Sequence, residues 1–230
     1  MKKYVIIAAL DYEVNIIRDA LGNASEISIL GFPAYKGIIG SCEVAVMRCG
    51  MGKVSAAIAT QAMIDFFRPD YVINTGCAGA LSPELRIGDV VVSECVVEWD
   101  LDLRAIGYPI GYIDAIGCVE MRASKLLCEK ILAASGAKVP VYGMIVSADQ
   151  FVSEDSQRKY ILSNFPAALC AEMEGAAVGQ ACMQNNVPFC IIRTMSDTAD
   201  GNSGVDFASF SVDAGKESAE RLIAMLNKEC

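Results

Sequence analysis

The sequence predicts an α/β fold with a mostly parallel or mixed sheet covered by helices on both faces. Three observations support this prediction. Apolar runs alternate with helical patterns along the chain. Hydrophobic residues make up 53% of the 230 residues and charged residues 20%, which is enough for a large core. No internal repeat or Pro/Ser-rich linker divides the chain, so we expect one domain spanning 1–230.

The first part of the chain supplies strand and helix patterns in turn. The run YVIIAAL at 4–10 is rich in β-branched residues and is typical of a buried strand. It stops at two acids without a cleavage site, so we do not interpret it as a signal peptide. A helix is predicted over 13–21, followed by strands at 26–31, 35–40 and 42–50.

A longer helix is predicted over 52–69, because apolar residues recur every four positions and Pro69 closes the pattern. The recurring residues are Val54, Ile58, Ala62 and Phe66. The remaining elements are expected, in order, as a strand running into a Gly-rich turn at 70–81, a strand at 88–99, a helix at about 120–134, a strand at 141–149, a polar helix near 153–163, strands at 167–171 and 188–197, and an amphipathic helix at about 206–228.

Composition excludes several classes of function. The chain has no histidine, which removes Ser-His-Asp and Cys-His systems and makes an ordinary zinc hydrolase improbable. The net charge is −9 and no run of Lys or Arg occurs, so nucleic acid and membrane surfaces are not expected partners. Ten cysteines are scattered through apolar runs without a Cys-x-x-Cys pair, as in reduced cytoplasmic proteins. No stretch is long enough to cross a membrane.

Polar or Gly-rich residues follow five of the predicted strands. In parallel sheets, binding residues gather where strands end, so these exits should form one site. The exits are marked by Glu13, Gly76–Gly79, Phe151, Glu172–Glu174 and Ser196–Asp197.

The stretch LCAEMEGAAV (169–178) places Glu172 and Glu174 in otherwise small, apolar chain, where lone carboxylates are costly to bury. If the segment is extended, the two acids face the same side. If a helix begins at Met173, they diverge and one of them caps it. Arg193 lies within a buried strand and needs a carboxylate or ligand partner.

Seven motifs together resemble the 5′-methylthioadenosine/S-adenosylhomocysteine nucleosidases of the nucleoside phosphorylase superfamily. They occur in the family's order over nearly the whole chain: ALDYEV, CGMGKVSAA, INTGCAGAL, GDVVVSE, IVSADQFV, EMEGAAV and RTMSDTAD. The resemblance implies a single domain with a central mixed, barrel-like β-sheet flanked by helices, and a homodimer. It also implies hydrolysis of the N-glycosidic bond of 5′-thio-substituted adenosines, with no metal and no organic cofactor.

The resemblance also implies roles for individual residues. Glu13 matches the general base for water, Glu174 the carboxylate that holds the ribose hydroxyls, and Asp197 the acid that serves the purine. The implied substrate-binding positions are Met51, Cys77, Gly79, Phe151, Val152, Glu172, Met173, Arg193, Ser196 and Phe207, and Leu103 and Ile106 match positions that close the partner subunit's pocket.

The chain departs from the family pattern at three positions: Cys77 replaces a more frequent Ser, Trp99 an expected His, and Ile106 a frequent aromatic residue. The substrate at the 5′ end therefore stays open among methylthioadenosine, S-adenosylhomocysteine, 5′-deoxyadenosine and aminodeoxyfutalosine. A phosphate-dependent phosphorylase is an alternative, although Asn74 stands where such relatives have Arg, and Arg48 has no assigned role. A non-catalytic nucleoside-binding protein is a third alternative.

Overall fold

Five strands of the sheet close into a barrel in the computed structural model of this chain, which describes residues 1–199 and 203–229. The barrel strands are β5 (Tyr71–Ala80), β6 (Val90–Glu98), β8 (Val141–Ser147), β9 (Ala168–Glu172) and β10 (Phe189–Asp197). β10 pairs in parallel with β5 and antiparallel with β6, β6 and β9 both run parallel to β8, and β9 meets β5 antiparallel. The expected single α/β domain with a mixed, barrel-like sheet is confirmed.

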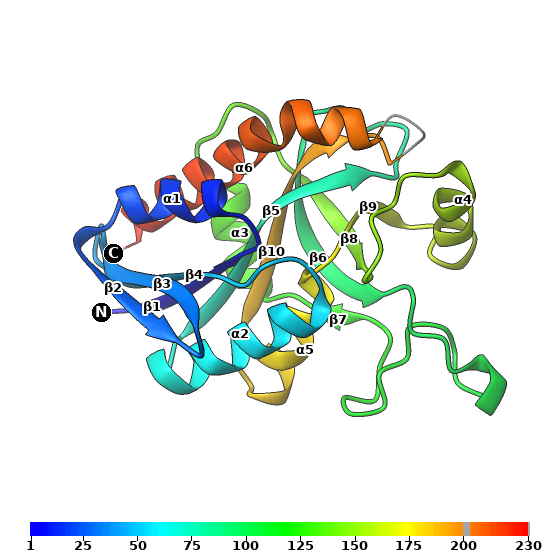
Figure 1. Cartoon of the computed structure of the whole chain (residues 1–230), viewed down its shortest axis with the longest axis horizontal. Coiled ribbons are helices and arrows are strands. Elements are labelled where there is room, and N and C mark those ends of the chain that lie inside the picture. Colours follow the sequence, from blue (N-terminus) through cyan, green and yellow to red (C-terminus); the bar gives the residue numbers. More distant parts are fainter. Residues whose placement is uncertain (200–202, 230) are drawn as a thin grey trace.

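The sheet continues beyond the barrel from β5 and is covered by helices on two sides (Figure 1). The extension runs in the order β1 (Lys3–Ala8), β4 (Cys42–Arg48), β3 (Phe32–Ile39) and β2 (Gly22–Ile29), and the short β7 (Met121–Arg122) pairs with β6. The helices are α1 (Asp11–Asp19), α2 (Lys53–Phe67), α3 (Lys125–Leu132), α4 (Asp155–Asn164), α5 (Gly175–Gln184) and α6 (Ser203–Lys228).

Two apolar clusters hold the helices to the sheet. Ile17 of α1, Leu127 of α3 and Leu222 of α6 are buried with one face of β1 and β4. Met63 of α2 and Val178 of α5 are buried on the other face. A fully buried side chain of this size contributes about 1.5–3 kcal/mol to folding, so both helical layers are firmly anchored.

The structure corrects two expectations about where the elements begin and end. The glycines expected in a turn after the strand lie within β5, which runs through to Ala80. Met121 and Arg122 pair with Val96 and Cys95 as strand β7, so the helix expected from about residue 120 begins at Lys125.

The face of α2 predicted by the four-residue spacing points outward. Val54 is 69%, Ile58 45% and Phe66 52% exposed, whereas Ala59 and Met63 face the core. The helix itself is confirmed. Among the described residues, none of the helices has the combination of length and hydropathy needed to cross a bilayer.

β1, β5 and β10 run parallel, so the carboxyl end of β1 lies beside those of the barrel strands β5 and β10, at one rim of the sheet. The segments that leave this rim lead into α1, into the loop before β6 and toward α6. Binding residues are expected at such a rim.

Candidate active site

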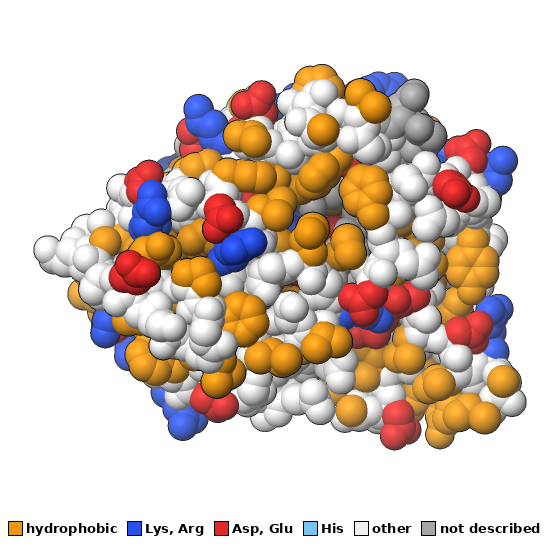
Figure 2. Space-filling model, viewed as in Figure 1, with side chains coloured by type: hydrophobic (Ala, Val, Ile, Leu, Met, Phe, Trp, Pro, Cys, Tyr) orange, Lys and Arg blue, Asp and Glu red, His pale blue; other side chains and the backbone are white. Residues whose placement is uncertain are grey.

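A pocket of about 590 Å³, partly open to solvent, lies at this rim. It opens on the face shown in Figure 2, where hydrophobic side chains surround it. All residues predicted for the catalytic and substrate-binding sets line it: Glu13, Met51, Cys77, Gly79, Phe151, Val152, Glu172, Met173, Glu174, Arg193, Ser196, Asp197 and Phe207.

The two residues assigned to a partner's pocket lie elsewhere. Leu103 and Ile106 belong to the long segment between β6 and β7 and do not line the pocket of their own chain. Ile106 is 70% exposed. It is therefore available to a second subunit, and its role stays a prediction.

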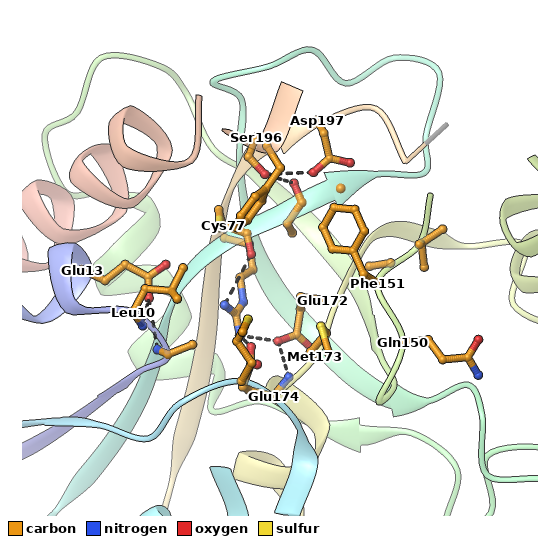
Figure 3. A pocket seen from close by; sticks show the side chains of 18 residues that line it. Leu10, Glu13, Cys77, Gln150, Phe151, Glu172, Met173, Glu174, Ser196 and Asp197 are labelled. Atoms are coloured by element: carbon orange, nitrogen blue, oxygen red, sulfur yellow. Dashed lines mark hydrogen bonds and ion pairs between the residues drawn. The ribbon is translucent and has the colours of Figure 1, made fainter. Parts of the chain in front are cut away.

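Glu13 enters the pocket from the first turn of α1, on one side of the view in Figure 3. Its Oε2 accepts hydrogen bonds from the backbone N–H groups of Ala9 and Leu10, both at 3.1 Å. These bonds fix the carboxylate at the start of the helix. Burial raises its pKa, while the nearby Arg193 and the backbone N–H groups oppose the shift. A carboxylate with a raised pKa is a better proton acceptor than an exposed one.

Asp197 ends β10 and reaches the pocket from the opposite side to Glu174 (Figure 3). The Ser196 hydroxyl donates to its Oδ2 at 2.9 Å, and the Ala199 N–H donates to its Oδ1 at 2.9 Å. Burial raises the pKa of Asp197, although the hydrogen bonds from Ala199, Ser196 and Ser203 counteract the rise. The protonated form, which can donate a proton, is thus easier to populate than for an exposed aspartate.

Arg193 is the charged centre of the pocket floor. The side chain is 2% exposed and rises from β10 between two acids. Its Nη2 forms ion pairs with Glu172 and with Glu174, the latter at 3.4 Å, and donates to the Asn74 amide oxygen. The expectation that this buried arginine has a carboxylate partner is therefore confirmed, and Arg193 has two such partners, Glu172 and Glu174.

The two acids of the EMEG motif have different surroundings. Glu172 accepts from the backbone N–H of Glu174 at 2.9 Å and of Gly175 at 2.8 Å, and from the Ser147 hydroxyl. It therefore caps α5 while neutralising Arg193. The helix begins only at Gly175, and both acids line one pocket and pair with Arg193, as expected for an extended segment. The capping expected from the other reading is also present, at Glu172.

Glu174 is less saturated and faces the cavity. Its Oε1 accepts from the Gly52 N–H at 2.9 Å, and its Oε2 lies 3.4 Å from Arg193 Nη2. Burial raises the pKa of Glu174 to about 7, with Arg193 opposing the shift and Glu172 adding to it. This acid is the one poised to accept hydrogen bonds from a ligand's hydroxyl groups.

Aromatic and thioether side chains form the other walls. Phe151 and Phe207 meet edge to face, with ring centroids 5.6 Å apart and planes at 79°. Val152 is buried beside them, and Met51 and Met173 also line the cavity. Such an apolar slot fits a flat heteroaromatic ring.

Cys77 lies in β5 at the pocket, close to Glu13. Burial and the charge of Glu13 raise the pKa of this thiol to about 12. It therefore stays protonated at neutral pH and is a poor nucleophile.

The sequence reasoning missed five lining residues: Ala9, Leu10, Ala78, Gln150 and Ala171. Four of them are small or aliphatic and carry no chemical signal, although Leu10 and Ala9 adjoin Glu13. Gln150 precedes Phe151 within a motif and could have been included for that reason. In the described parts of the chain, no group of three or more Cys, Asp or Glu side chains is arranged to hold a metal ion.

Within residues 1–199 and 203–229, no set of arginines lines the pocket in the converging arrangement that binds phosphate. Arg48 is 40% exposed in its side chain and pairs with Asp11 at 3.4 Å. Asn74 is buried and donates to the Ile7 carbonyl at 3.0 Å. Arg193, the one arginine lining the pocket among the described residues, is already paired with carboxylates.

Comparison with known proteins agrees with this site. The model of the phosphorylase superfamily matches residues 3–228. The 5′-methylthioadenosine/S-adenosylhomocysteine nucleosidase of Geobacillus kaustophilus is 39% identical over 228 residues, which cover 98% of this chain and 97% of the relative. The chain belongs to this nucleosidase family.

Solved structures extend the likeness to three dimensions. The nucleosidase of Neisseria meningitidis in complex with methylthio-immucillin-A has a TM-score of 0.96 at 33% identity, and each chain is covered completely. The futalosine hydrolase of Helicobacter pylori has a TM-score of 0.94 at 31% identity, with 99% of this chain and 98% of that chain covered. The nucleosidase fold is thus shared by proteins with different named substrates.

One departure from the family pattern has a structural explanation. Trp99 is 4% exposed and packs edge to face against Tyr160, with centroids 6.1 Å apart. It belongs to the apolar cluster that includes Val152 and Ile161 of α4. In this nucleosidase, Trp99 is therefore a core residue below the Phe151–Val152 wall.

Proposed function

We propose that this protein hydrolyses the N-glycosidic bond of 5′-thio-substituted adenosines, methylthioadenosine and S-adenosylhomocysteine, releasing adenine and the thioribose. The observation that carries the proposal is the meeting of Glu13, Glu174 and Asp197 around one cavity beside an aromatic slot. Cleavage of this bond places positive charge on the sugar, which nearby carboxylates stabilise.

The three acids divide the reaction between them. The purine packs against the Phe151–Phe207 pair, and Asp197 donates a proton to its N7 as the C1′–N9 bond breaks. Glu174 accepts hydrogen bonds from the ribose hydroxyls. Glu13 accepts a proton from the water whose oxygen bonds to C1′. The proton gained by adenine and the hydroxyl gained by the sugar balance one water molecule, and no cofactor enters.

Two further statements complete the proposal. We place the protein in the cytoplasm, because nine free cysteines among the described residues, seven of them buried, suit a reducing compartment. We also propose a homodimer in which Leu103 and Ile106 of one subunit close the other's pocket. Its support is an exposed apolar surface on α2, comprising Val54, Ile58 and Phe66, which continues to Met51 at the pocket.

The assay that tests the activity uses purified protein, methylthioadenosine and phosphate-free buffer. We expect free adenine and a reducing sugar. Adenine release that requires phosphate and yields a sugar 1-phosphate would instead establish the phosphorylase alternative. If no 5′-modified adenosine is cleaved while binding is retained, the protein is a nucleoside binder.

A second substrate class is aminodeoxyfutalosine, which the likeness to futalosine hydrolase supports. Assaying it beside methylthioadenosine, S-adenosylhomocysteine and 5′-deoxyadenosine ranks the 5′ substituents. Of these four nucleosides, we expect a thio-substituted adenosine to have the highest kcat/KM.

A further inference from the structure

The N-terminus of α2 is capped by carboxylates from distant parts of the chain. Gly52 precedes the helix with φ +96°, and neither a capping side chain of its own nor an acid in the first turn satisfies the free N–H groups. Instead, the Gly52 N–H donates to Glu174 Oε1 at 2.9 Å, and the Lys53 N–H donates to Asp149 Oδ1 at 2.7 Å. The N-terminus of α2 is therefore held by Glu174, a pocket residue, and Glu174 is in turn held by the N-terminus of α2.

The Lys53 side chain closes a ring of contacts on the other side of this segment. Its Nζ lies 2.6 Å from Asp100 Oδ1 and 3.1 Å from Glu98 Oε2. The second oxygen of Asp100 accepts from the Asp149 N–H at 3.1 Å. Lys53, Asp100 and Asp149 thus hold one another through both side chain and backbone, with Glu98 as a fourth member. We name these four residues the Lys53 clamp.

The clamp is better shielded than an ordinary surface ion pair. The side chains of Lys53, Glu98 and Asp100 are 16%, 10% and 17% exposed. Burial alone lowers the pKa of Lys53, but the Asp100 and Glu98 carboxylates outweigh it, and the pKa is raised. The ammonium group therefore stays charged, and without it Glu98 and Asp100 would face each other unpaired, which is strongly unfavourable for buried groups.

We infer that Lys53 is a positioning residue for the glycosidic reaction: the clamp holds residues 50–53 so that the Gly52 N–H is aimed at Glu174. This inference rests on the proposed function and assigns a part to a side chain that does not line the pocket. Met51 lies in the same segment and does line it, so a displaced segment also alters the wall beside the ribose.

Loss of the clamp has a defined electrostatic effect. The Gly52 hydrogen bond lowers the pKa of Glu174, so its loss raises that pKa further. The other groups whose charges act on Glu174 are Arg193, Glu172, Glu13 and Cys49, and none of them is a member of the clamp. Because the ionised carboxylate is the form that accepts from ribose hydroxyls, activity should be lost at a higher pH than in the wild type.

The test compares Lys53→Met, Lys53→Arg and Asp100→Asn with the wild type on methylthioadenosine, from acidic to alkaline pH. We expect Lys53→Met to lower kcat/KM by roughly 10- to 100-fold, in line with small misplacements of binding groups, and to move the acid limb of kcat/KM to higher pH. Lys53→Arg should recover most of both effects. Asp100→Asn removes the charge that pairs with Lys53 without changing the size of the side chain, and it should shift the acid limb in the same direction. This variant tests the inference if Lys53→Met folds poorly.

Lys138→Met is the matched control. Lys138 forms a more exposed ion pair with Asp89 at 2.7 Å, away from the pocket, so its loss should leave the pH profile unchanged. An unshifted acid limb in Lys53→Met and Asp100→Asn, with an active wild type, would overturn the inference alone. A wild type that cleaves no 5′-modified adenosine would contradict the proposed function and the inference with it.

Discussion

Four buried acids at one pocket have different neighbours. Glu172 accepts from two backbone N–H groups and Ser147 and pairs with Arg193, whereas Glu174 accepts from one N–H group and lies 3.4 Å from Arg193 Nη2. Glu13 is held by two N–H groups at a helix start, and Asp197 by a hydroxyl and one N–H. The proposed roles of base and acid rest on these differences in surroundings.

The proposed base can be tested by Glu13→Gln. The amide keeps the size of the side chain and its carbonyl can still accept from Ala9 and Leu10, but it cannot take a proton from water. We expect kcat to fall by about 10²–10⁴-fold, the usual contribution of a general base, while the Kd for methylthioadenosine stays near the wild-type value. Rapid-quench turnover and calorimetric binding measure the two quantities.

Glu26→Gln, at an exposed site on β2, serves as the control and should change neither quantity. Turnover that survives in Glu13→Gln would show that another group activates the water.

Which acids gather at the pocket was predictable, and the resemblance also implied a role for each, but the hydrogen bonds that surround Glu172 were not predictable. Glu13, Glu174 and Asp197 can each be identified from the few residues around them, because each follows a predicted strand and lies in a recognisable motif. The saturation of Glu172 depends on Ser147 and Arg193, which are 25 and 21 residues away. A local sequence pattern does not show that residues so far apart in the sequence are in contact.

At the scale of elements, the course of β5 explains its glycines. Gly76 lies under the Arg193 side chain, and a Cβ added there would collide with the guanidinium and lie 3.0 Å from Glu13 Oε1. A tight turn was expected from the same residues. A glycine in the sequence indicates that a Cβ would not fit at that position. Only the structure shows that the Cβ is excluded by a side chain from another strand.

Gly76→Ala should therefore displace Arg193 and Glu13 together. We expect a loss of about 1–3 kcal/mol in the free energy of unfolding, as for overpacked cores, and a larger proportional loss of kcat/KM. Urea unfolding and steady-state kinetics give the two values.

Gly204→Ala is the matched control, because a Cβ there meets nothing within 4 Å and the residue lies in α6. It should be neutral or slightly stabilising, since Ala favours helices over Gly. Wild-type activity in Gly76→Ala would contradict the prediction that the added Cβ displaces Arg193 and Glu13.

Helix α2 shows a different limit of sequence reasoning. Spacing predicts the helix correctly, yet two apolar faces compete and the sequence alone does not tell which one packs inward. The inner face combines the small Ala56 and Ala59, which bring the helix close to the sheet and to α5, with the larger Met63, Ile64 and Phe67. Val54, Ile58 and Phe66 form the outer face.

At the scale of the whole molecule, this outward face supports the proposed dimer. Figure 2 shows hydrophobic side chains gathered over α2 and over the segment between β6 and β7. Val54→Asp places a charge there. We expect the variant to elute at half the apparent mass of the wild type and to lose much of its kcat/KM for methylthioadenosine, because a lone subunit lacks Leu103 and Ile106 of its partner at the 5′ end.

Val139→Asp is the control, since Val139 is 90% exposed but lies between α3 and β8. It should keep the wild-type mass. A Val54→Asp variant that also keeps the wild-type mass and activity would rule out this face as the interface.

The order of the strands also has a consequence for protein synthesis. Glu13 leaves the ribosome early, whereas Asp197 lies on β10, the strand that joins β5 to β6 and closes the ring. A nascent or prematurely terminated chain that ends before β10 has neither a complete barrel nor its second proton-transfer group. We therefore expect unfinished copies to be inactive toward nucleosides. Because Phe207 of α6 also lines the pocket, turnover in an extract should report only chains translated into their last helix.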